Sequence, residues 1–336
     1  MINVGVVGYG YWGPNLVRNF AEVPGSHLAA VCDLRAERLS SVQARYPSAR
    51  ITTRYADLLA DPKIDAIAVA TPVSTHFGLA MQALKAGKHI FVEKPMTATS
   101  PEAKKLIEEA KRRKRVLLVD HTFVYTHAVQ KIRELVAGNQ LGDIYYYDSV
   151  RVNLGLFQHD VDVIWDLAVH DLSIMDYVLP AHPVAVSVTG MSHVKGRPEN
   201  IAYLTLFFPN SMIAHFHVNW LAPVKIRRTL IGGSKKMIVY DDLEPSEKIK
   251  IYDKGITMVN DETVYKMRIG YRTGDMWAPQ IEMTEALRAE VAHFIRCIEQ
   301  GEKPVTGGDV GLRVVRIMEA ATRSMSKKGR LVRLGR

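Results

Sequence analysis

The sequence predicts an α/β domain with a doubly wound parallel sheet, followed by an α+β domain built on a large, mostly antiparallel open sheet. Three observations lead to this fold class. In the first third, short apolar runs alternate with helical patterns, which is typical of a parallel sheet covered on both faces. After about residue 122, strand-like runs follow one another with short turns. At 336 residues, the chain is also too long for one compact core.

The elements of the first domain can be read in order. The apolar runs that predict strands are "NVGVVGYG", "HLAAVCDL", "DAIAVATP", "HIFVEKP" and "VLLVDH". Helical patterns separate them: Trp12 to about Glu22, "RAERLSSVQARY", "STHFGLAMQALKAGK" with Gly87 as its stop, and "SPEAKKLIEEAKRRK". In the last of these, we expect Ser100 to be the N-cap and Pro101 the first helical residue.

The second domain begins where this alternation ends. A helix, "AVQKIRELVAG", precedes strand-like runs that are typical of an antiparallel sheet: "IYYYDSVRVNL", "AVSVTGMSHV", "IAYLTLFF", "MIAHFHVNW", "RRTLIGG" and "KKMIVYDD". One helix, from about Trp165 to Leu179, interrupts them, and helices near 280–299 and 309–328 close the chain. We therefore predict domains at 1–122 and 123–336, with no low-complexity linker between them.

Composition narrows the classes of function. Hydrophobic residues make up 47% of the chain and charged residues 24%, as in ordinary globular proteins. No membrane-spanning run or signal-peptide pattern is present, so we expect a cytoplasmic protein. Two cysteines, Cys32 and Cys297, make neither a disulfide framework nor a metal signature, and we interpret both as buried small hydrophobes.

The formal net charge is +9, and part of the excess lies in the final segment "RSMSKKGRLVRLGR". Nucleic-acid binding is one interpretation of such a segment. No aromatic platform interleaves with these basic residues, however, so we expect no nucleic-acid partner. A solvated surface bias, or attraction of an anionic small substrate, accounts for the charge.

A glycine motif supplies the first functional signal. In "GVVGYGYWG", Gly8, Gly10 and Gly13 have the G-x-G-x-x-G spacing, at the end of a strand and the start of a helix. Gly8 permits the tight turn, Gly10 lets the backbone approach a pyrophosphate, and Gly13 lets the helix pack closely on the strand. The helix N-terminus then offers free N–H groups to phosphates. This context predicts a Rossmann domain that binds a dinucleotide.

The acidic residue that such a domain needs is Asp33, which ends the second strand at the distance from Gly13 that the motif requires. A carboxylate there accepts hydrogen bonds from the adenosine ribose hydroxyls of NAD and repels a 2′-phosphate. Arg35 is close enough in sequence to neutralise part of that charge. We therefore favour NAD as the cofactor and leave NADP open.

The segment "FVEKP" at 91–95 places Glu93 and Lys94 at the end of an apolar strand. Burying charge is costly unless it is paired or used. Counted as the fourth of five strands, in the usual order 3-2-1-4-5, this strand lies beside the first, where ligands bind. We therefore interpret Glu93 and Lys94 as site residues and Pro95 as the strand's stop. The alternative is a surface ion pair.

A second constellation lies in "DLAVH", where Asp166 and His170 are four residues apart in a helical pattern. Their side chains share one helix face, so the carboxylate can orient the imidazole and stabilise its protonated form. Oxidation of an alcohol needs a base for the hydroxyl proton and a cation near the oxygen. Lys94, Asp166 and His170 supply these groups if they converge. The alternative for the Asp–His pair is an ordinary helix-surface contact.

Four segments, "GYGYWG", "ATPVSTH", "VEKP" and "WDLAVHDLSIMDY", together resemble the Gfo/Idh/MocA oxidoreductases, which include glucose–fructose oxidoreductase and inositol dehydrogenases. The resemblance covers essentially the whole chain. It implies hydride transfer between nicotinamide and a sugar or cyclitol hydroxyl carbon, without metal. It also implies a homodimer or homotetramer that forms through the C-terminal sheet.

The resemblance carries roles to individual positions. It implies that Lys94, Asp166 and His170 are catalytic, with the acid/base role divided between Lys94 and His170. Thr71, Pro72 and His76 resemble the family segment along the cofactor, although His76 has the alternative of a surface residue at a helix start. Tyr11 and Trp12 pack near the cofactor or in the core. The cofactor-binding set is then Gly8, Gly10, Tyr11, Trp12, Gly13, Asp33, Thr71, Pro72, His76, Glu93 and Lys94.

The substrate is the least determined feature. "VRVNLGLFQHDVDVIWDLAVHD" resembles the nucleotide-sugar branch of the family, which acts at C3 of a UDP- or dTDP-linked sugar. Asn153, Gln158 and His159 are candidate substrate contacts, and Arg227 and Arg228 are candidates for a diphosphate or a solvated strand end. We expect a UDP-N-acetylhexosamine or its uronate. The alternatives are a free-sugar or inositol dehydrogenase and, in a different class, a dinucleotide-binding sensor without catalysis.

Overall fold

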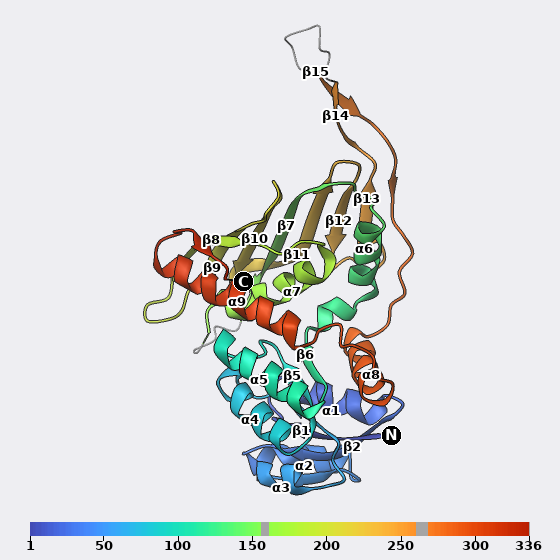
Figure 1. The fold of residues 1–336 in the computed structure, drawn as a ribbon, viewed down its shortest axis with the longest axis vertical. Helices are drawn as coiled ribbons and strands as arrows, with labels where there is room; N and C mark the ends of the chain where they lie inside the picture. Colours follow the sequence, from blue (N-terminus) through green and yellow to red (C-terminus); the bar gives the residue numbers. More distant parts are fainter. Residues whose placement is uncertain (156–160, 260–267, 336) are drawn as a thin grey trace. The chain divides into compact units, whose positions relative to one another are not determined.

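The computed structural model describes residues 1–155, 161–259 and 268–335. The chain divides into two compact units, Met1–Thr126 with Thr284–Arg316 and His127–Met283 with Ile317–Arg336. Figure 1 shows the helices and strands of both units. Unit 1 therefore takes in residues 284–316, which the predicted boundary near residue 122 assigns to the second domain.

Unit 1 is a six-stranded parallel sheet with the order β3-β2-β1-β4-β5-β6. Its strands are β1 (Ile2–Val7), β2 (Ser26–Cys32), β3 (Arg50–Thr52), β4 (Ala66–Val69), β5 (His89–Glu93) and β6 (Leu117–Asp120). Its helices are α1 (Gly13–Glu22), α2 (Ala36–Arg45), α3 (Tyr55–Ala60), α4 (Val73–Lys85), α5 (Ser100–Arg113) and α8 (Ala286–Glu299), with the 3-10 turn η1 (Thr122–Tyr125). The predicted doubly wound sheet is confirmed.

The sheet order corrects one prediction. The sequence pattern does not reveal β3 and α3, and without them "HIFVEKP" is predicted to be the fourth strand, beside the first. In the structure, β1 pairs with β2 and β4, whereas β5 pairs with β4 and β6. The strand at the reversal point is therefore β4, and β5 lies one position farther out. A three-residue strand carries too little periodicity to be recognised locally.

The start of α5 corrects the prediction that Ser100 is the N-cap of this helix. The N-cap is Thr99 rather than Ser100: its side chain accepts from the Glu102 backbone N–H, and the Glu102 side chain accepts from the Thr99 N–H. Pro101 lies inside the first turn. A capping box satisfies two backbone donors instead of one, which favours Thr99 over its neighbour.

Helix α8 belongs to unit 1 because it completes a hydrophobic core. Phe20 of α1, Phe91 of β5 and Phe294 of α8 pack edge-to-face, with ring centroids 5.5–6.3 Å apart. Leu287 and Val291 of α8 are buried in the same cluster. A segment near the C-terminal end of the chain thus covers one face of the parallel sheet.

Unit 2 is built on a nine-stranded sheet with the order β16-β13-β12-β11-β7-β10-β9-β8-β17. The strands are β7 (Ile144–Leu154), β8 (Ala185–Met191), β9 (Ile201–Phe207), β10 (Ile213–Asn219), β11 (Leu221–Gly233), β12 (Met237–Asp241), β13 (Ile249–Tyr252), β16 (Met276–Trp277) and β17 (Val332–Arg333). A separate hairpin pairs β14 (Gly255–Val259) with β15 (Arg268–Arg272). All pairings within the sheet are antiparallel except that of β7 with β10.

Strands β9 and β10 of this sheet alternate between buried and more exposed side chains. In β10, Ala214, Phe216 and Val218 are buried, while Ile213 and His215 are exposed. One face therefore packs against a core, and helices α6 (His127–Ala137) and α7 (Val169–Val178) lie on one side of the sheet (Figure 1). Among the described residues, side chains on the other face of β9 and β10, such as Tyr203, Phe207 and Ile213, are exposed.

The helix expected from Trp165 to Leu179 is irregular at its start. Residues Ile164–Ala168 form a π-helical turn, η2, before α7 begins at Val169. The last long helix, α9 (Gly308–Ser326), begins in unit 1 and ends in unit 2. π-Helical turns are rare and occur frequently at functional sites, so η2 marks a region of interest.

Candidate active site

The loop after β1 has the form that a dinucleotide-binding turn requires. Gly8 has φ +94°, and a Cβ added there would lie 2.4 Å from the Ala70 carbonyl oxygen. A Cβ on Gly13 would lie 2.2 Å from the Gly8 carbonyl oxygen. A Cβ on Gly10 would meet only the Arg38 Nη1, at 3.4 Å. Gly8 and Gly13 are thus needed for the turn itself, whereas Gly10 leaves its outer side open to a ligand.

Asp33 follows β2 and is held by the same loop. Its Oδ2 accepts from the Tyr9 N–H (2.7 Å), and its Oδ1 accepts from the Arg35 N–H (2.9 Å). The Arg35 Nε and the Arg38 Nη1 each lie 3.8 Å from a carboxylate oxygen. Sequence reasoning considered Arg35 and missed Arg38, although a basic residue in the first turn of the next helix was a visible signal. Two guanidinium groups therefore flank the carboxylate.

These residues fit a nicotinamide dinucleotide. The glycine turn and the N-terminus of α1 would hold the pyrophosphate, and the Asp33 carboxylate would accept from the ribose hydroxyls. The bound dinucleotide supplies the hydride acceptor or donor. No group of three or more His, Cys, Asp or Glu side chains in the described part of the chain is arranged to hold a metal ion.

His76 lies where β4 and β5 end, but as a buried brace. Its Nδ1 is 2.8 Å from the Pro95 carbonyl oxygen, its Nε2 is 2.7 Å from the Thr71 carbonyl oxygen, and its side chain is almost fully buried. Burial lowers the pKa of His76. The alternative of a surface residue is therefore wrong. The His76 side chain connects the loop that carries Thr71 and Pro72 to the segment that follows Lys94. A role of His76 in cofactor binding stays a prediction.

Lys94 follows β5 directly, and its neighbours on the sheet edge are acidic. Glu93 pairs in register with Asp120 of β6. Burial raises the pKa of Asp120, and hydrogen bonds from Thr122 and Trp12 together with the positive charge of Lys94 oppose that rise. The positive charge of Lys94 therefore acts on the buried carboxyl group of Asp120 and favours its ionised form.

The two aromatic residues of the glycine loop differ. The Tyr11 side chain is 88% exposed, which excludes the core alternative for that residue. Trp12 is half-buried, and its Nε1 donates to the Asp120 Oδ2 at 2.8 Å. The indole therefore ties the loop after β1 to the end of β6, three strands away in the sheet order. Sequence reasoning did not identify Asp120.

In unit 2, the two residues of the "DLAVH" motif lie on η2 and α7. The Asp162 Oδ1 accepts from the backbone N–H groups of Ile164 (2.9 Å) and Trp165 (3.1 Å) and so caps the π-helical turn. The Asp166 Oδ2 accepts from the Nε1 of the fully buried Trp220 at 3.0 Å. His170 is the second residue of α7 and is half-buried. Trp220 orients the carboxylate, and the sequence analysis missed it because it lies far from the motif along the chain.

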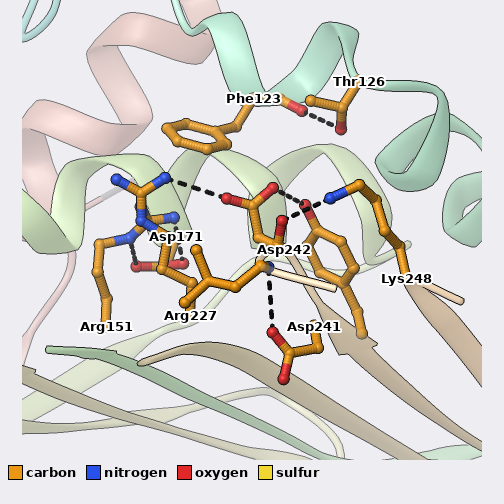
Figure 2. Close-up of polar contacts among 10 residues, drawn as sticks. Phe123, Thr126, Arg151, Asp171, Arg227, Asp241, Asp242 and Lys248 are labelled. Carbon is orange, nitrogen blue, oxygen red and sulfur yellow. Dashed lines mark hydrogen bonds and ion pairs between the residues drawn. The ribbon is translucent and has the colours of Figure 1, made fainter. Parts of the chain in front are cut away.

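A buried ion pair anchors α7 next to His170. The Arg151 Nε and Nη2 donate to the Asp171 Oδ2 (2.6 Å) and Oδ1 (3.0 Å), with both side chains almost completely buried, as Figure 2 shows. A bidentate pair of this kind fixes orientation as well as distance. Because Asp171 follows His170, the pair limits how α7 can rotate over β7.

Arg227 and Arg228 have intramolecular partners. Arg227 donates to the Asp242 carboxylate at 3.1 Å (Figure 2), and Arg228 forms two hydrogen bonds, at 3.1 and 2.9 Å, to the Asp241 Oδ2. These contacts are those of a strand end rather than a prepared diphosphate site. The diphosphate interpretation of these two residues therefore gains no support.

The remaining candidates are distributed as follows. Asn153 lies on β7 and is half-buried, whereas Gln158 and His159 lie outside the described residues. Lys94 belongs to unit 1, and Asp166 and His170 belong to unit 2. The convergence of Lys94 with His170, and the roles assigned to all these residues, stay predictions.

Comparison with known proteins covers nearly the whole chain. Residues 2–121 match the Gfo/Idh/MocA family described as "Oxidoreductase family, NAD-binding Rossmann fold", and residues 133–334 match its "C-terminal alpha/beta domain". Within the described residues, none of the helices has the length and hydrophobicity needed to cross a bilayer.

Two curated relatives and one solved structure show the range of similarity. The chain is 31% identical over 324 residues to a UDP-N-acetylglucosamine 3-dehydrogenase of Acidithiobacillus ferrooxidans, covering 94% of each protein. A crystal structure of that enzyme superposes with a TM-score of 0.83 at 28% identity, covering 97% of this chain and 98% of the other. A myo-inositol 2-dehydrogenase of Thermotoga maritima is 23% identical, with 97% of each covered.

Both domain matches agree with the glycine turn, the acidic residue after β2 and the large C-terminal sheet. The chain therefore belongs to the Gfo/Idh/MocA family of nicotinamide-dependent oxidoreductases, as the resemblance in its motifs predicts, and it is a dehydrogenase of the class that acts on sugar hydroxyl groups.

Proposed function

We propose that this enzyme transfers a hydride between a nicotinamide dinucleotide and C3 of a nucleotide-linked sugar, with a UDP-N-acetylhexosamine or its uronate as substrate. The observation that carries this proposal is the similarity to a UDP-N-acetylglucosamine 3-dehydrogenase along 94% of both chains. The net charge of +9 is consistent with an anionic substrate.

The proposed chemistry uses three side chains. His170 takes the proton of the C3 hydroxyl while the C3–H hydrogen leaves as hydride, which yields a 3-keto sugar and reduced nicotinamide. The Lys94 ammonium stabilises the negative charge that develops on the oxygen and shares the proton transfer. Asp166, oriented by Trp220, stabilises the His170 imidazolium. The reverse sequence reduces the ketone.

The surroundings of Asp33 support NAD and also accommodate NADP. The carboxylate suits ribose hydroxyls, whereas Arg35 and Arg38, each with a nitrogen 3.8 Å from it, can turn toward a 2′-phosphate. We propose that NAD is preferred and that NADP is accepted more weakly. Michaelis constants for the two cofactors, measured with one sugar substrate, test this order.

A panel of UDP-sugars, free hexoses and inositols, followed by nicotinamide absorbance, tests the substrate. Turnover restricted to UDP-sugars supports the proposal. Turnover of inositols alone would instead favour the second candidate, an inositol dehydrogenase, which the full-length similarity to the Thermotoga maritima enzyme keeps in view. Nucleotide binding without turnover of any of these compounds would favour the non-catalytic sensor.

The assigned residues are tested with Lys94→Ala and His170→Ala. Each should lower kcat by at least ~100-fold, since general acid–base catalysis contributes about 10²–10⁴-fold. Lys104→Ala is a matched control because Lys104 is an exposed residue of α5. Near-normal turnover in both site variants would contradict the assignment.

We also propose that the open face of the unit 2 sheet binds a second copy of this chain. Tyr203 and Phe207 of β9 and Ile213 of β10 are exposed there, and the Tyr203 ring stacks on His217 with centroids 4.5 Å apart. An apolar, aromatic sheet face of this kind is typical of an interface. Light scattering should show a dimer or tetramer, and Tyr203→Glu with Phe207→Glu should shift it to monomer. A monomeric wild-type chain would refute this proposal.

A further inference from the structure

Unit 1 buries two carboxyl groups against each other. Asp120, at the end of β6, is 1% exposed, and Glu290, on α8, is fully buried. The negative charge of Asp120 raises the pKa of Glu290, so the two carboxyl groups are close neighbours. Two neighbouring buried carboxylates repel each other, and burial disfavours the ionised form of both, which favours a proton on one of them.

Hydrogen-bond donors decide which one. Asp120 accepts from the Trp12 Nε1 at 2.8 Å and from the Thr122 hydroxyl at 2.5 Å, so both of its oxygens have donors. Neither oxygen of Glu290 accepts a hydrogen bond from any N–H or O–H of the described residues. Donors stabilise the ionised form of a carboxyl group. This difference in donors favours the carboxylate form of Asp120 and the protonated form of Glu290.

The charges around the pair agree with this arrangement. Lys94 favours the ionised form of Asp120, whereas burial, the charge of Asp120 and the nearby Glu93 raise the pKa of Glu290 well above its ordinary value. The single hydrogen of the Thr122 hydroxyl is donated to Asp120. Thr122 therefore offsets only part of the increase in the pKa of Glu290. On η1, burial raises the pKa of Tyr125 well above its ordinary value, so this neighbour is neutral. Within the described part of this cluster, Lys94 is the cation that acts on Asp120.

We propose that Asp120 is a positioning residue for the dinucleotide site, held as a carboxylate by the proton on Glu290 and acting through the indole of Trp12. Trp12 is the N-cap residue of α1 and lies between Gly10 and Gly13 in the glycine loop. The bond to Asp120 fixes the indole across the carboxyl ends of the sheet, which is the side on which a doubly wound sheet binds its ligand. The proposal deepens the assigned dehydrogenase function and rests on dinucleotide binding by this loop.

The protonation state is tested with infrared spectroscopy on the purified full chain at pH 7. The wild-type protein should show the carbonyl stretching band of a protonated carboxylic acid, and Glu290→Gln should remove it. A difference spectrum without that band would overturn the shared proton. Because this measurement needs no nucleotide, it stays informative even if the assigned function fails.

The positioning role is tested by the dissociation constant of NADH, measured by calorimetry. Asp120→Ala and Trp12→Phe should each raise it about tenfold, the loss expected for one hydrogen bond to a charged group. Since Asp120 acts through Trp12, the double variant should also show about a tenfold rise rather than about a hundredfold. Multiplying effects would overturn the proposal. Asp120→Asn takes the place of Asp120→Ala if the latter does not fold.

Two further variants separate positioning from general damage. Glu290→Gln keeps a donor of the same shape toward Asp120 and should hold the NADH affinity within about threefold of wild type, whereas Glu290→Ala should weaken it about tenfold. Trp165→Phe is the matched control, since the Trp165 Nε1 donates at 3.0 Å to Thr322 in unit 2. Equal losses in both Glu290 variants would contradict the acid–carboxylate pair. Wild-type protein that does not bind NADH would instead refute the function on which the proposal rests.

Discussion

The two units of this chain bury charge in different ways. In unit 1, Asp120 and Glu290 are two buried carboxyl groups of the same charge type, and we assign the proton that offsets their repulsion to Glu290. In unit 2, Arg151 and Asp171 have opposite signs and form a bidentate pair at 2.6 and 3.0 Å. The unit 2 pair needs no other group to be neutral, whereas the unit 1 carboxylate keeps two other donors, Trp12 and Thr122, in place.

This difference separates architecture from ligand binding. The ion pair between Arg151 of β7 and Asp171 of α7 fixes the position of α7. Removing this pair should first lower the free energy of unfolding. Removal of Asp120, a carboxylate that holds the glycine loop, should first lower the affinity for the nucleotide. Four substitutions sharpen the comparison, from the largest expected effect to the smallest.

Asp171→Ala should be the most damaging change. It removes the carboxylate that the buried Arg151 guanidinium contacts through two nitrogens, and breaking a buried ion pair typically destabilises a protein by about 3–5 kcal/mol. Thermal or urea unfolding measures the loss. The double variant Arg151→Met with Asp171→Leu should recover most of it, because apolar side chains then replace both members of the pair. A double variant as unstable as the single one would show that the pair holds α7 by something other than charge balance.

Asp162→Asn tests a buried carboxyl group that accepts hydrogen bonds from two backbone N–H groups. Burial raises the pKa of Asp162 to about 6, from 3.8. The folded state therefore binds the proton more tightly than the unfolded state, so this group favours folding at pH 4 and loses that contribution as pH rises through 6. Two pKa units correspond to at most about 3 kcal/mol at pH 7.

Asparagine caps a helix as well as aspartate does. Asp162→Asn should therefore raise the melting temperature at pH 7 and remove the part of the stability change between pH 4 and 6 that Asp162 causes. Melting curves of both proteins over this range provide the measurement. A variant that is less stable at pH 7 would show that the negative charge on the cap is favourable.

Arg38→Ala should change the preference between NAD and NADP with little effect on stability, because we expect the Arg38 guanidinium to contact the cofactor. Loss of one guanidinium should raise the Michaelis constant for NADP about tenfold, as expected for a charge-assisted hydrogen bond, and leave that for NAD nearly constant. Steady-state kinetics with both cofactors measure the ratio. Equal changes for both cofactors would mean that Arg38 supports the Asp33 loop and not the 2′-phosphate.

Trp220→Phe should have the smallest effect. It removes the donor to the Asp166 Oδ2 and should lower kcat about fivefold, or ~1 kcal/mol, with the Michaelis constant of the cofactor unchanged. Trp165→Phe, which breaks an indole bond to Thr322, controls for the loss of an indole. A kcat equal to that of the control would show that Trp220 serves the core alone.

Several features could be predicted from sequence because they depend on local chemistry. The G-x-G-x-x-G spacing required Gly8 and Gly13 at positions where a Cβ would collide with backbone, and the structure places both in that turn. The alternation in β9 and β10 required one buried and one open face. These signals are short-range, so no tertiary information is needed to recognise them.

Other features could not be predicted from the sequence, for reasons that are equally physical. The short strand β3 has too few residues to show a period, and its omission shifted the expected position of β5 by one strand. Helix α8 joined unit 1 because Phe294 packs against Phe20 and Phe91, a contact between segments from opposite ends of the chain. The Asp162 side chain accepts from the first two N–H groups of the π-helical turn η2, a contact that a helix-period pattern does not reveal.

By itself, then, the sequence determined the fold class, the dinucleotide loop and the family, since each rests on residues close together in the chain whose backbone conformation or side-chain type is locally constrained. The tertiary structure alone decided how buried charge is balanced. Whether Asp120 or Glu290 keeps the proton, and whether Arg151 has a partner, depends on donors and cations that distant strands and helices bring within a few ångströms. Electrostatic free energy depends on distance and burial, and spacing along the chain specifies neither.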